Sequence, residues 1–512
     1  MSDTNPKIAI IGAGIAGLCT AVYARKSGYE AVVLDQHDSP GGLATSWRRG
    51  EYTFETCLHW LLGSKPGATL HSEWQEVFDI DELRFVNDEE YVRVEDECGG
   101  SLQIFANVER LEAELLSKAP EDAKEIRRLT ADIRRFTKFE LPEPSARGPR
   151  HWLTMMGALP YLPSMRRLMR ETLEEYGTRF TNPLLRSFFG NGEGARLSVL
   201  PLVFSMAWMS QQNAGYPIGG SQAVIRAIVE RLKFLGGDLR LAAKVEKILV
   251  DRDTAIGVHL ANGKTVMADW VISAADGHAT IFDMLDGRYI NERIEKIYKT
   301  FESFSSYVQV SLGVARDLSG QAGFVLRQLD VPVMVDPGTW VKQMSFRFFH
   351  FDPTFSPAGK TAVTCFLPTR NFEYWLNLRQ DSAKYEAEKQ RLAESVIRVL
   401  EKTVHNVRYD LEVTDVSTPA TVIRCTGNWQ GSMEGWLLTP RTGLNQIPST
   451  LPGLDRFMMV GQWVMPGGGL PSGLMTARSA IQAVCKHDHR AFMGGGIGMR
   501  QISGADALAK AS

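Results

Sequence analysis

The chain begins with an alternation of apolar runs and glycine-rich turns. Residues 8–11 are uniformly apolar and predict a buried strand, and residues 21–25 continue a helix that ends at Gly28. A second apolar run covers residues 31–34, and Asp35 follows it directly. A strand, a helix and a second strand in this order predict a βαβ unit, in which a crossover helix joins two parallel strands.

Residues 221–275 predict an amphipathic helix followed by a β-meander. The apolar stripe of the helix consists of Val224, Ile225, Ile228, Val229 and Leu232. Strands are expected at 239–241, 245–250, 257–260, 265–267 and 268–275. Between two of them, Ala261-Asn262-Gly263-Lys264 is the sequence signal of a type I′ hairpin turn.

The C-terminal part of the chain repeats the arrangement of strand, glycine turn and helix. Residues 456–460 predict a strand and residues 474–484 a helix, and the connection reads GQWVMPGGGLPSG. Two charged segments with an apolar stripe, 121–138 and 384–402, predict helices with one solvated face. Strands that alternate with helices favour an α/β protein.

The first glycine turn has the spacing of a dinucleotide-binding loop. Gly12, Gly14 and Gly17 form a GxGxxG motif between the first strand and the helix. The first glycine permits a tight turn, the second lets the backbone approach a pyrophosphate, and the third permits close packing of helix against strand. Asp35 is then placed to accept hydrogen bonds from a ribose. Together these features predict a dinucleotide site.

The residues after Asp35 indicate which dinucleotide binds. Gly41-Gly42 follow shortly after this acid, an arrangement that resembles the FAD-binding signature of the amine-oxidase and phytoene-desaturase flavoproteins. The resemblance implies that backbone amides of this second glycine pair also meet the FAD diphosphate. The family usually has arginine after the pair, whereas this chain has Leu43, which removes one expected charge contact.

The C-terminal glycine segment resembles the closing motif of the same family, with Thr476-Ala477 in place of the usual Ser-Gly. An extended FAD has two distant ends. The resemblance implies that this segment holds the isoalloxazine end with backbone amides and a positive helix end. The expected FAD-binding residues are Gly12, Gly14, Ile15, Ala16, Gly17, Asp35, Gln36, Gly41, Gly42, Leu43, Val245, Gly461, Gly468, Gly469, Leu470 and Pro471.

A third segment supplies candidate catalytic residues. Residues 50–60 resemble the G-(Y/F)-x-F-D-x-G segment of phytoene desaturases, carotenoid isomerases and retinol saturases, with Glu55 for the usual Asp and Thr56 for the usual Gly. His59 is the candidate proton donor near the flavin, with Glu55 behind it. The alternative interpretation is that His59 is a satisfied core histidine and Glu55 a structural partner.

Composition narrows the class of protein. The chain has 512 residues, 44% of them hydrophobic and 23% charged, which is ordinary for a globular protein. A formal net charge of −2 gives no electrostatic case for nucleic acid binding. Six scattered cysteines without metal-ligand spacing favour a reducing compartment and no metal site. No apolar run approaches the roughly 18 residues of a spanning helix and no signal peptide is evident, so we expect a cytoplasmic protein.

The resemblance implies a fold of the α/β class with two interleaved domains. We expect a Rossmann-type, glutathione-reductase-like FAD-binding domain made of residues 1–84, 211–288 and 411–490. An α+β substrate domain then comprises residues 85–210 and 289–410, and residues 491–512 form a flexible tail. This is the two-domain architecture of amine oxidases.

Two apolar segments of the expected substrate domain bear on how a substrate enters. Residues 151–170 mix aromatic, Met and Leu residues with arginines, and Pro160 and Pro163 divide them into two short pieces. Residues 197–209 are apolar but too short to span a membrane. We favour a buried helical cap with an apolar pocket lining. The alternative is a peripheral contact with the inner face of the membrane.

The resemblance implies an FAD-dependent oxidoreductase that acts on carbon–carbon bonds of an apolar isoprenoid or polyene. Saturation, desaturation and isomerisation use the same fold. Because the chain has no second GxGxxG domain, we expect a separate electron acceptor or donor. Two alternatives remain: a flavin amine oxidase, which needs an aromatic cage and often a lysine at the flavin, and a non-catalytic escort protein of the same fold without flavin.

Overall fold

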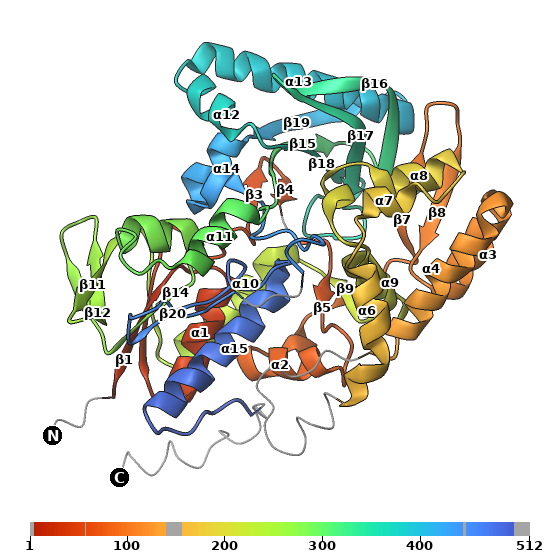
Figure 1. Cartoon of the computed structure of the whole chain (residues 1–512). Helices are drawn as coiled ribbons and strands as arrows, with labels where there is room; N and C mark the ends of the chain where they lie inside the picture. The colour runs from red at the N-terminus through yellow and green to blue at the C-terminus, as the bar shows by residue number, and fades with distance from the viewer. Residues whose placement is uncertain (1–4, 57, 140–155, 444–446, 496–512) are drawn as a thin grey trace, which may run out of the picture.

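The computed structural model describes residues 5–56, 58–139, 156–443 and 447–495. Two large sheets dominate the molecule, and helices cover both of them (Figure 1). The N-terminal and C-terminal segments of the chain meet in the first sheet, which carries both glycine motifs at one edge.

The first sheet has five strands in the order β10-β2-β1-β14-β20, and every neighbouring pair is parallel. These strands are β1 (Lys7–Ile11), β2 (Glu30–Leu34), β10 (Asp238–Arg240), β14 (Trp270–Ser273) and β20 (Phe457–Met459). The predicted βαβ unit is confirmed, because β1 and β2 pair in parallel across α1 (Ile15–Lys26). Strands from three distant parts of the sequence thus form one sheet.

Both faces of this sheet are covered, and alternate residues of β1 face opposite sides. Ile8 and Ile10 belong to the core shared with the helices, whereas Ala9 and Ile11 belong to the core shared with the β-meander. The helix side is formed by α1, α10 (Gly220–Phe234) and α15 (Gly469–His487), and the other side by β11 (Val245–Asp251), β12 (Thr254–Leu260) and β13 (Thr265–Met267). Burial on both faces explains why these strands are continuous apolar runs.

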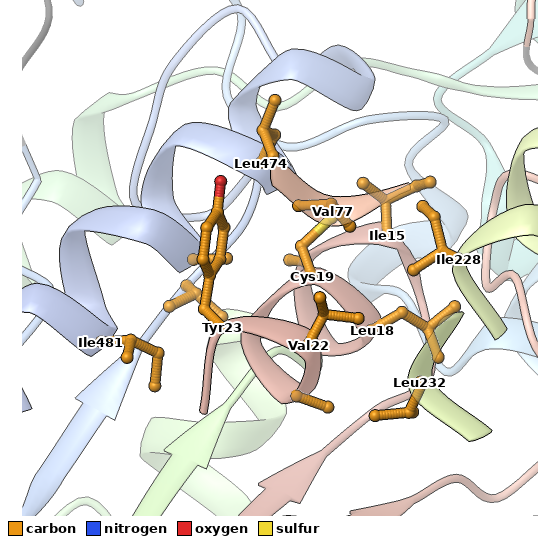
Figure 2. Packing of buried hydrophobic residues seen from close by; sticks show 14 of the residues in the cluster. Ile15, Leu18, Cys19, Val22, Tyr23, Val77, Ile228, Leu232, Leu474 and Ile481 are labelled. Carbon is orange, nitrogen blue, oxygen red and sulfur yellow. The ribbon is translucent and has the colours of Figure 1, made fainter. Parts of the chain in front are cut away.

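Helices α1 and α15 pack against each other at a glycine. A Cβ atom on Gly473 would lie 2.6 Å from Cγ2 of Ile15, so glycine is what lets α15 come this close to α1. In Figure 2, Leu474 and Ile481 of α15 lie on one side of α1 and Leu232 of α10 on the other. Since each glycine motif opens one of the two packed helices, this contact fixes the motifs relative to each other.

The second sheet has seven strands in the order β19-β15-β18-β17-β16-β7-β8, antiparallel except for the β16–β7 pair. Its strands are β7 (Glu90–Glu95), β8 (Ser101–Phe105), β15 (Ser306–Val314), β16 (Phe324–Asp336), β17 (Thr339–Phe348), β18 (Thr361–Thr369) and β19 (Leu411–Ser417). Helix α13 (Ser382–Thr403) covers one face with its apolar stripe. The remaining described elements are α2 (Thr69–Val77), α3 (Val108–Lys118), α4 (Ala123–Phe136), α6 (Leu162–Leu168), α7 (Leu173–Gly177), α8 (Pro183–Gly190), α9 (Val199–Ser210), α11 (Glu292–Thr300), α12 (Phe372–Leu378), α14 (Pro419–Thr426), β3 (Ser46–Arg49), β4 (Tyr52–Glu55), β5 (Leu61–Leu62), β6 (Phe85–Val86) and β9 (Ala214–Pro217).

The helices of the middle region form a separate apolar core over β7 and β8. Every residue of α9 is buried or half-buried, as a covered cap helix requires. Pro160 and Pro163 lie in the first turns of two short helical pieces, Leu159–Tyr161 and α6, which confirms the predicted interruption. The first residues of that segment, 151–155, lie outside the described residues. No helix in the described part of the chain is both long enough and apolar enough to cross a membrane.

Three expectations about local structure need correction. Helix α15 begins at Gly469 rather than at residue 474. The predicted hairpin turn is present, but only Gly263 has a positive φ (+80°) while Asn262 does not, so the turn is not type I′.

Strand β19 pairs with β15 in the second sheet, so residues 411–417 do not belong to the cofactor sheet and we place that domain boundary after Ser417. The remaining domain limits stay a proposal, and the tail beyond residue 495 lies outside the described residues.

Candidate functional site

A cavity of about 910 Å³ opens at the carboxyl ends of the parallel strands. Residues at or just beyond the ends of β1, β2, β14 and β20 line it, namely Ile11, Leu34, Ala274 and Val460. Thirteen of the sixteen residues expected to bind FAD line the same cavity: Gly12, Gly14, Ile15, Ala16, Asp35, Gln36, Gly41, Gly42, Leu43, Val245, Gly461, Gly469 and Leu470. The two glycine motifs therefore share one continuous site.

The first glycine motif has a different constraint at each glycine. Gly12 has φ +99°, a left-handed conformation that favours glycine, and its N–H donates to the Leu34 carbonyl at 2.8 Å. A Cβ atom on Gly14 would have one neighbour within 4 Å, the carbonyl oxygen of Gly41 at 3.8 Å. A Cβ atom on Gly17 would lie 1.9 Å from the Gly12 carbonyl oxygen. Gly14 thus faces open space, whereas Gly17 does not line the cavity and serves helix–strand packing.

Asp35 organises the loops around the first motif. Its Oδ2 accepts the Ala13 N–H at 2.6 Å and its Oδ1 accepts the His37 N–H at 2.8 Å. The second glycine pair docks on the same loop, because the Gly41 N–H donates to the Ala13 carbonyl at 2.9 Å. Gly41 and Gly42 both have positive φ values, +133° and +62°. The carboxylate that is expected to hold a ribose also fixes the shape of the phosphate cradle.

The closing motif presents a helix start to the cavity. Gly469 and Leu470 begin α15 and line the cavity, and no side chain caps this helix end. The unpaired N–H groups of a first helical turn suit an anion or a carbonyl oxygen. Gly461 has φ +96° and donates its N–H to Thr476 Oγ1 at 2.8 Å. Of the expected binding residues in this motif, Gly468 and Pro471 do not line the cavity.

The residues present fit an FAD molecule. The cavity reaches from a phosphate cradle with open space at Gly14 to an uncapped helix start at Gly469. Its walls also carry four cations that sequence reasoning missed, Arg49, Lys244, Lys247 and Arg424. Lys244 and Lys247 flank Val245, a residue expected to bind FAD, but Lys247 is ion-paired with Asp286 and Arg49 with Asp415. Their scattered positions gave no motif by which to find them.

Glu55 is the last residue of β4 and does not line the cavity, and its carboxylate lies at the start of α10. Its carboxylate accepts the Ser221 hydroxyl at 2.6 Å, the Ser221 N–H at 3.2 Å and the Leu58 N–H at 2.9 Å. A Cβ atom on Gly220 would lie 1.8 Å from Oε2 of Glu55, so that glycine makes room for the carboxylate. Burial raises the pKa of Glu55 to about 7, and the hydrogen bonds from Ser221 and Leu58 oppose that rise. The contacts describe a residue that holds a helix N-terminus.

The expected pair of His59 and Glu55 is not present. Among the described contacts, the His59 ring packs beside Trp60 and Phe324, and neither carboxylate oxygen of Glu55 contacts it. Desolvation and the positive charge of Arg347 lower the pKa of His59 to about 3. The ring is therefore neutral near pH 7 and lacks the proton that an acid catalyst would donate. His59 does not line the cavity either, so the structural interpretation of both residues is favoured.

Two carboxyl groups in the cavity wall, the buried Asp276 and the half-buried Glu434, were not singled out from the sequence. Asp276 follows β14 and accepts the N–H groups of Ala279 and Trp429, each at 2.8 Å. Burial raises its pKa to about 6, and these hydrogen bonds limit the rise. Burial raises the pKa of Glu434 to about 8. Neither residue belongs to a spaced motif, and the long loop that carries Glu434 gave no periodic signal.

Aromatic residues gather beside the closing motif, which the sequence did not reveal. Trp463 and Trp436 pack edge to face at a centroid distance of 5.1 Å, and Trp429 lies 6.0 Å from Trp463. Trp463 is buried and donates its Nε1–H to Asn428 Oδ1 at 3.1 Å, while Trp436 donates to the Trp463 carbonyl. These side chains form a core cluster in which the ring N–H groups of Trp463 and Trp436 are satisfied, rather than two parallel walls of an amine cage, and Trp463 also lines the cavity.

Comparison with known proteins agrees with this site. A family model described as flavin containing amine oxidoreductase matches residues 15–485. The chain is 23% identical to the chloroplastic prolycopene isomerase of Daucus carota, over 95% of this chain and 80% of that protein. It is 24% identical to the neurosporene-forming phytoene desaturase of Cereibacter sphaeroides, over 91% of this chain and 92% of that protein.

A solved structure shares the fold. An oxidoreductase from Methanosarcina mazei superposes with a TM-score of 0.61 at 17% identity, over 93% of this chain and all of that one. The expected α/β fold is thereby confirmed. Two glycine motifs on one cavity, together with a flavin family match over most of the chain, confirm FAD as the cofactor. The chain belongs to the flavin-containing amine oxidoreductases.

Proposed function

We propose that this protein is an FAD-dependent oxidoreductase that acts on carbon–carbon bonds of an apolar polyene. The observation that carries the proposal is the single cavity that joins both glycine motifs. Two of the relatives that it resembles are a prolycopene isomerase, over 80% of that protein, and a phytoene desaturase, over 92% of that protein. When bound, the flavin supplies transfer of a hydride equivalent to or from carbon.

The protein's own residues hold and orient the cofactor in this proposal. Gly12, Gly14, Gly41 and Gly42 offer backbone to the diphosphate, and Asp35 offers carboxylate oxygens to the ribose. The start of α15, at Gly469, stabilises negative charge at the opposite end of the cavity. The candidate acids near the cavity either have their hydrogen bonds satisfied or are neutral. We therefore expect substrate positioning and exclusion of water to contribute more to the reaction rate than a charged acid–base pair.

The experiment that tests the proposal follows the visible absorbance of the protein-bound flavin under anaerobic conditions. We expect one of three responses with isoprenoid polyenes. Bleaching of the oxidised protein by a more saturated compound, which loses two hydrogens while the flavin gains two electrons, indicates a desaturase. Reoxidation of the dithionite-reduced protein by a polyene indicates a saturase. A geometric change in the polyene with no net flavin change indicates an isomerase.

The same experiment separates the alternatives. Bleaching by primary or secondary amines, without a response to any polyene, would show a flavin amine oxidase and contradict the proposal. A purified protein that carries no flavin and does not take up added FAD would favour the escort protein. The core cluster around Trp463 and its satisfied polar atoms favour the polyene reaction over the amine reaction. The electron acceptor or donor is a separate molecule in this proposal.

We also propose that the protein is cytoplasmic and that the cap around α6 contacts a bilayer surface to collect an apolar substrate. Met156 and Leu159 are exposed by 60% and 56%. Two exposed arginines follow them, Arg166 on α6 and Arg170 just after α6. Apolar tips beside arginines suit an anionic lipid surface. The cysteines of the described residues are free, which suits a reducing compartment.

Vesicle flotation checks this contact. We expect the wild type to float with vesicles that contain anionic phosphatidylglycerol. The double variant Met156→Glu/Leu159→Glu should float about tenfold less, because two apolar side chains that would insert into the lipid are replaced by charged ones. The control is Met493→Glu, a similarly exposed methionine (55%) outside the cap, which should float like the wild type. A wild type that stays with the soluble fraction would exclude the membrane contact and leave the flavin chemistry untouched.

A further inference from the structure

Glu434 occupies an unusual position in the cavity wall. It lies in the loop after α14, lines the cavity together with Gly461 and Gly469, and is half-buried. Its backbone carbonyl accepts the Ser432 hydroxyl. Within the described parts of the chain, its carboxyl group has no hydrogen-bond or ion-pair partner. A carboxyl group that is desolvated but unpaired is costly unless something else in the cavity binds it.

The closing glycine turn is shaped around this side chain. A Cβ atom on Gly468 would lie 2.4 Å from Oε2 and 2.9 Å from Cδ of Glu434. Gly468 also has φ +59°, so both its conformation and its lack of a side chain suit this contact. The glycine that we expected to touch the cofactor instead seats the Glu434 carboxyl beside the first turn of α15. This places the group at the end of the cavity where the flavin ring is expected.

The protonation state of Glu434 follows from its surroundings. Desolvation is the cause that raises its pKa to about 8, and no neighbouring charge contributes to the shift. Near pH 7 the group is therefore mostly a neutral carboxylic acid with one O–H to donate. Asp276 and Glu55 differ, because backbone N–H groups satisfy both of them. Of these three residues, only Glu434 lines the cavity with an O–H group that has no described acceptor.

We propose that Glu434 is a further cofactor-binding group, which in its protonated form donates a hydrogen bond to an acceptor atom on the flavin end of bound FAD. Nothing in the GxGxxG or closing motifs assigns such a group. The inference rests on FAD occupying the cavity and is independent of the substrate class. A neutral acid suits this position because a carboxylate would repel the negative charge that a flavin gains on reduction.

Binding of FAD to the flavin-free protein tests this proposal across a pH series. For the wild type, we expect the dissociation constant to be constant below pH 7 and to rise about tenfold between pH 7 and pH 9, since the donor is lost as Glu434 ionises. Glu434→Gln keeps a neutral donor of the same size and should remove most of this rise. Glu434→Ala should bind FAD about tenfold more weakly than the wild type at pH 7.

Other ionisable groups line the same cavity. They are Asp35, His37, Arg49, Lys244, Glu246, Lys247, Asp276, Asp283, Tyr307, Arg424 and Cys425. The two residues that contact Glu434 directly, Gly468 and Ser432, are uncharged. The glutamine variant separates Glu434 from all of these groups, because they are unchanged in it. Glu230→Gln, at an exposed position on α10, is the matched control and should follow the wild type at every pH.

The midpoint potential of the bound flavin provides a second readout. Measured against a reference dye at pH 7, it should be lower in Glu434→Ala than in the wild type, and close to the wild type in Glu434→Gln. The proposal is overturned if Glu434→Gln retains the full pH dependence, or if Glu434→Ala binds FAD as tightly as the wild type at pH 7. If the wild type bound FAD but its flavin did not respond to polyenes, the proposed function would be contradicted, whereas the inference about Glu434 would not be affected.

Discussion

An alanine at position 14 is expected to weaken FAD binding about 100-fold while the polypeptide stays folded. The added Cβ atom has one neighbour within 4 Å, at 3.8 Å, so the chain itself has room for it. Gly14 is the extended N-cap residue of α1, with φ −72°, so alanine fits the backbone as well. The methyl group then projects where the diphosphate must approach the backbone, and we expect FAD to bind about 100-fold more weakly.

Titration of the flavin-free protein with FAD, followed by flavin fluorescence, measures this effect. Urea unfolding of the same flavin-free protein should give a free energy within about 1 kcal/mol of the wild type, because exchange of a glycine N-cap for the poorer alanine costs about 1 kcal/mol or less. If Gly14→Ala bound FAD normally, the diphosphate could not lie against this turn. If it unfolded the protein, the open space at Gly14 would be a wrong description of the cradle.

An alanine at position 17 is expected to destabilise the protein itself. Its Cβ atom would lie 1.9 Å from the Gly12 carbonyl oxygen and 3.3 Å from Cβ of Ala274. Both neighbours belong to the sheet and its first turn, so α1 must move away from β1. We expect the free energy of unfolding to fall by about 3 kcal/mol and FAD binding to be lost with it, because the displaced turn is the phosphate cradle.

Urea unfolding of the flavin-free variant measures the loss of stability, and the flavin content of the purified protein measures the loss of binding. Gly190→Ala is the matched control. Gly190 ends α8, and a Cβ atom there would have no described neighbour within 4 Å. This variant should keep its flavin and unfold within about 1 kcal/mol of the wild type. Equal stability of Gly17→Ala and the wild type would contradict the packing role of Gly17.

The cofactor site was largely predictable because its parts are local in sequence. The GxGxxG loop, the acid after β2 and the glycine-rich start of α15 each need particular backbone conformations, and glycine is the residue that permits them. Apolar periodicity likewise located β1, β2, α10 and the β-meander, because a strand buried on both faces has few residue types to choose from. These features do not depend on distant partners.

The roles of individual acids were not predictable, because burial and partners come from residues far away in sequence. Glu55 lies in a segment that resembles a catalytic region of related enzymes. Its carboxylate instead binds the start of α10 at Gly220 and Ser221, which lie 165 or more residues later in the sequence. Desolvation, and to a lesser extent the positive charge of Arg347 on β17, lower the pKa of His59, so it is not an acid near pH 7. Glu434 had no sequence signal, and only the folded chain shows that it lines the cavity and lies against Gly468.

The sequence by itself therefore determined the fold class, the cofactor and the two ends of its binding site, since these depend on short segments with strict backbone requirements. The tertiary structure alone decided which carboxyl groups are satisfied and which is free, that Gly468 makes room for Glu434, and that the aromatic residues near the closing motif form one core cluster. Those outcomes depend on solvent exclusion and on contacts between elements, which no single stretch of sequence contains.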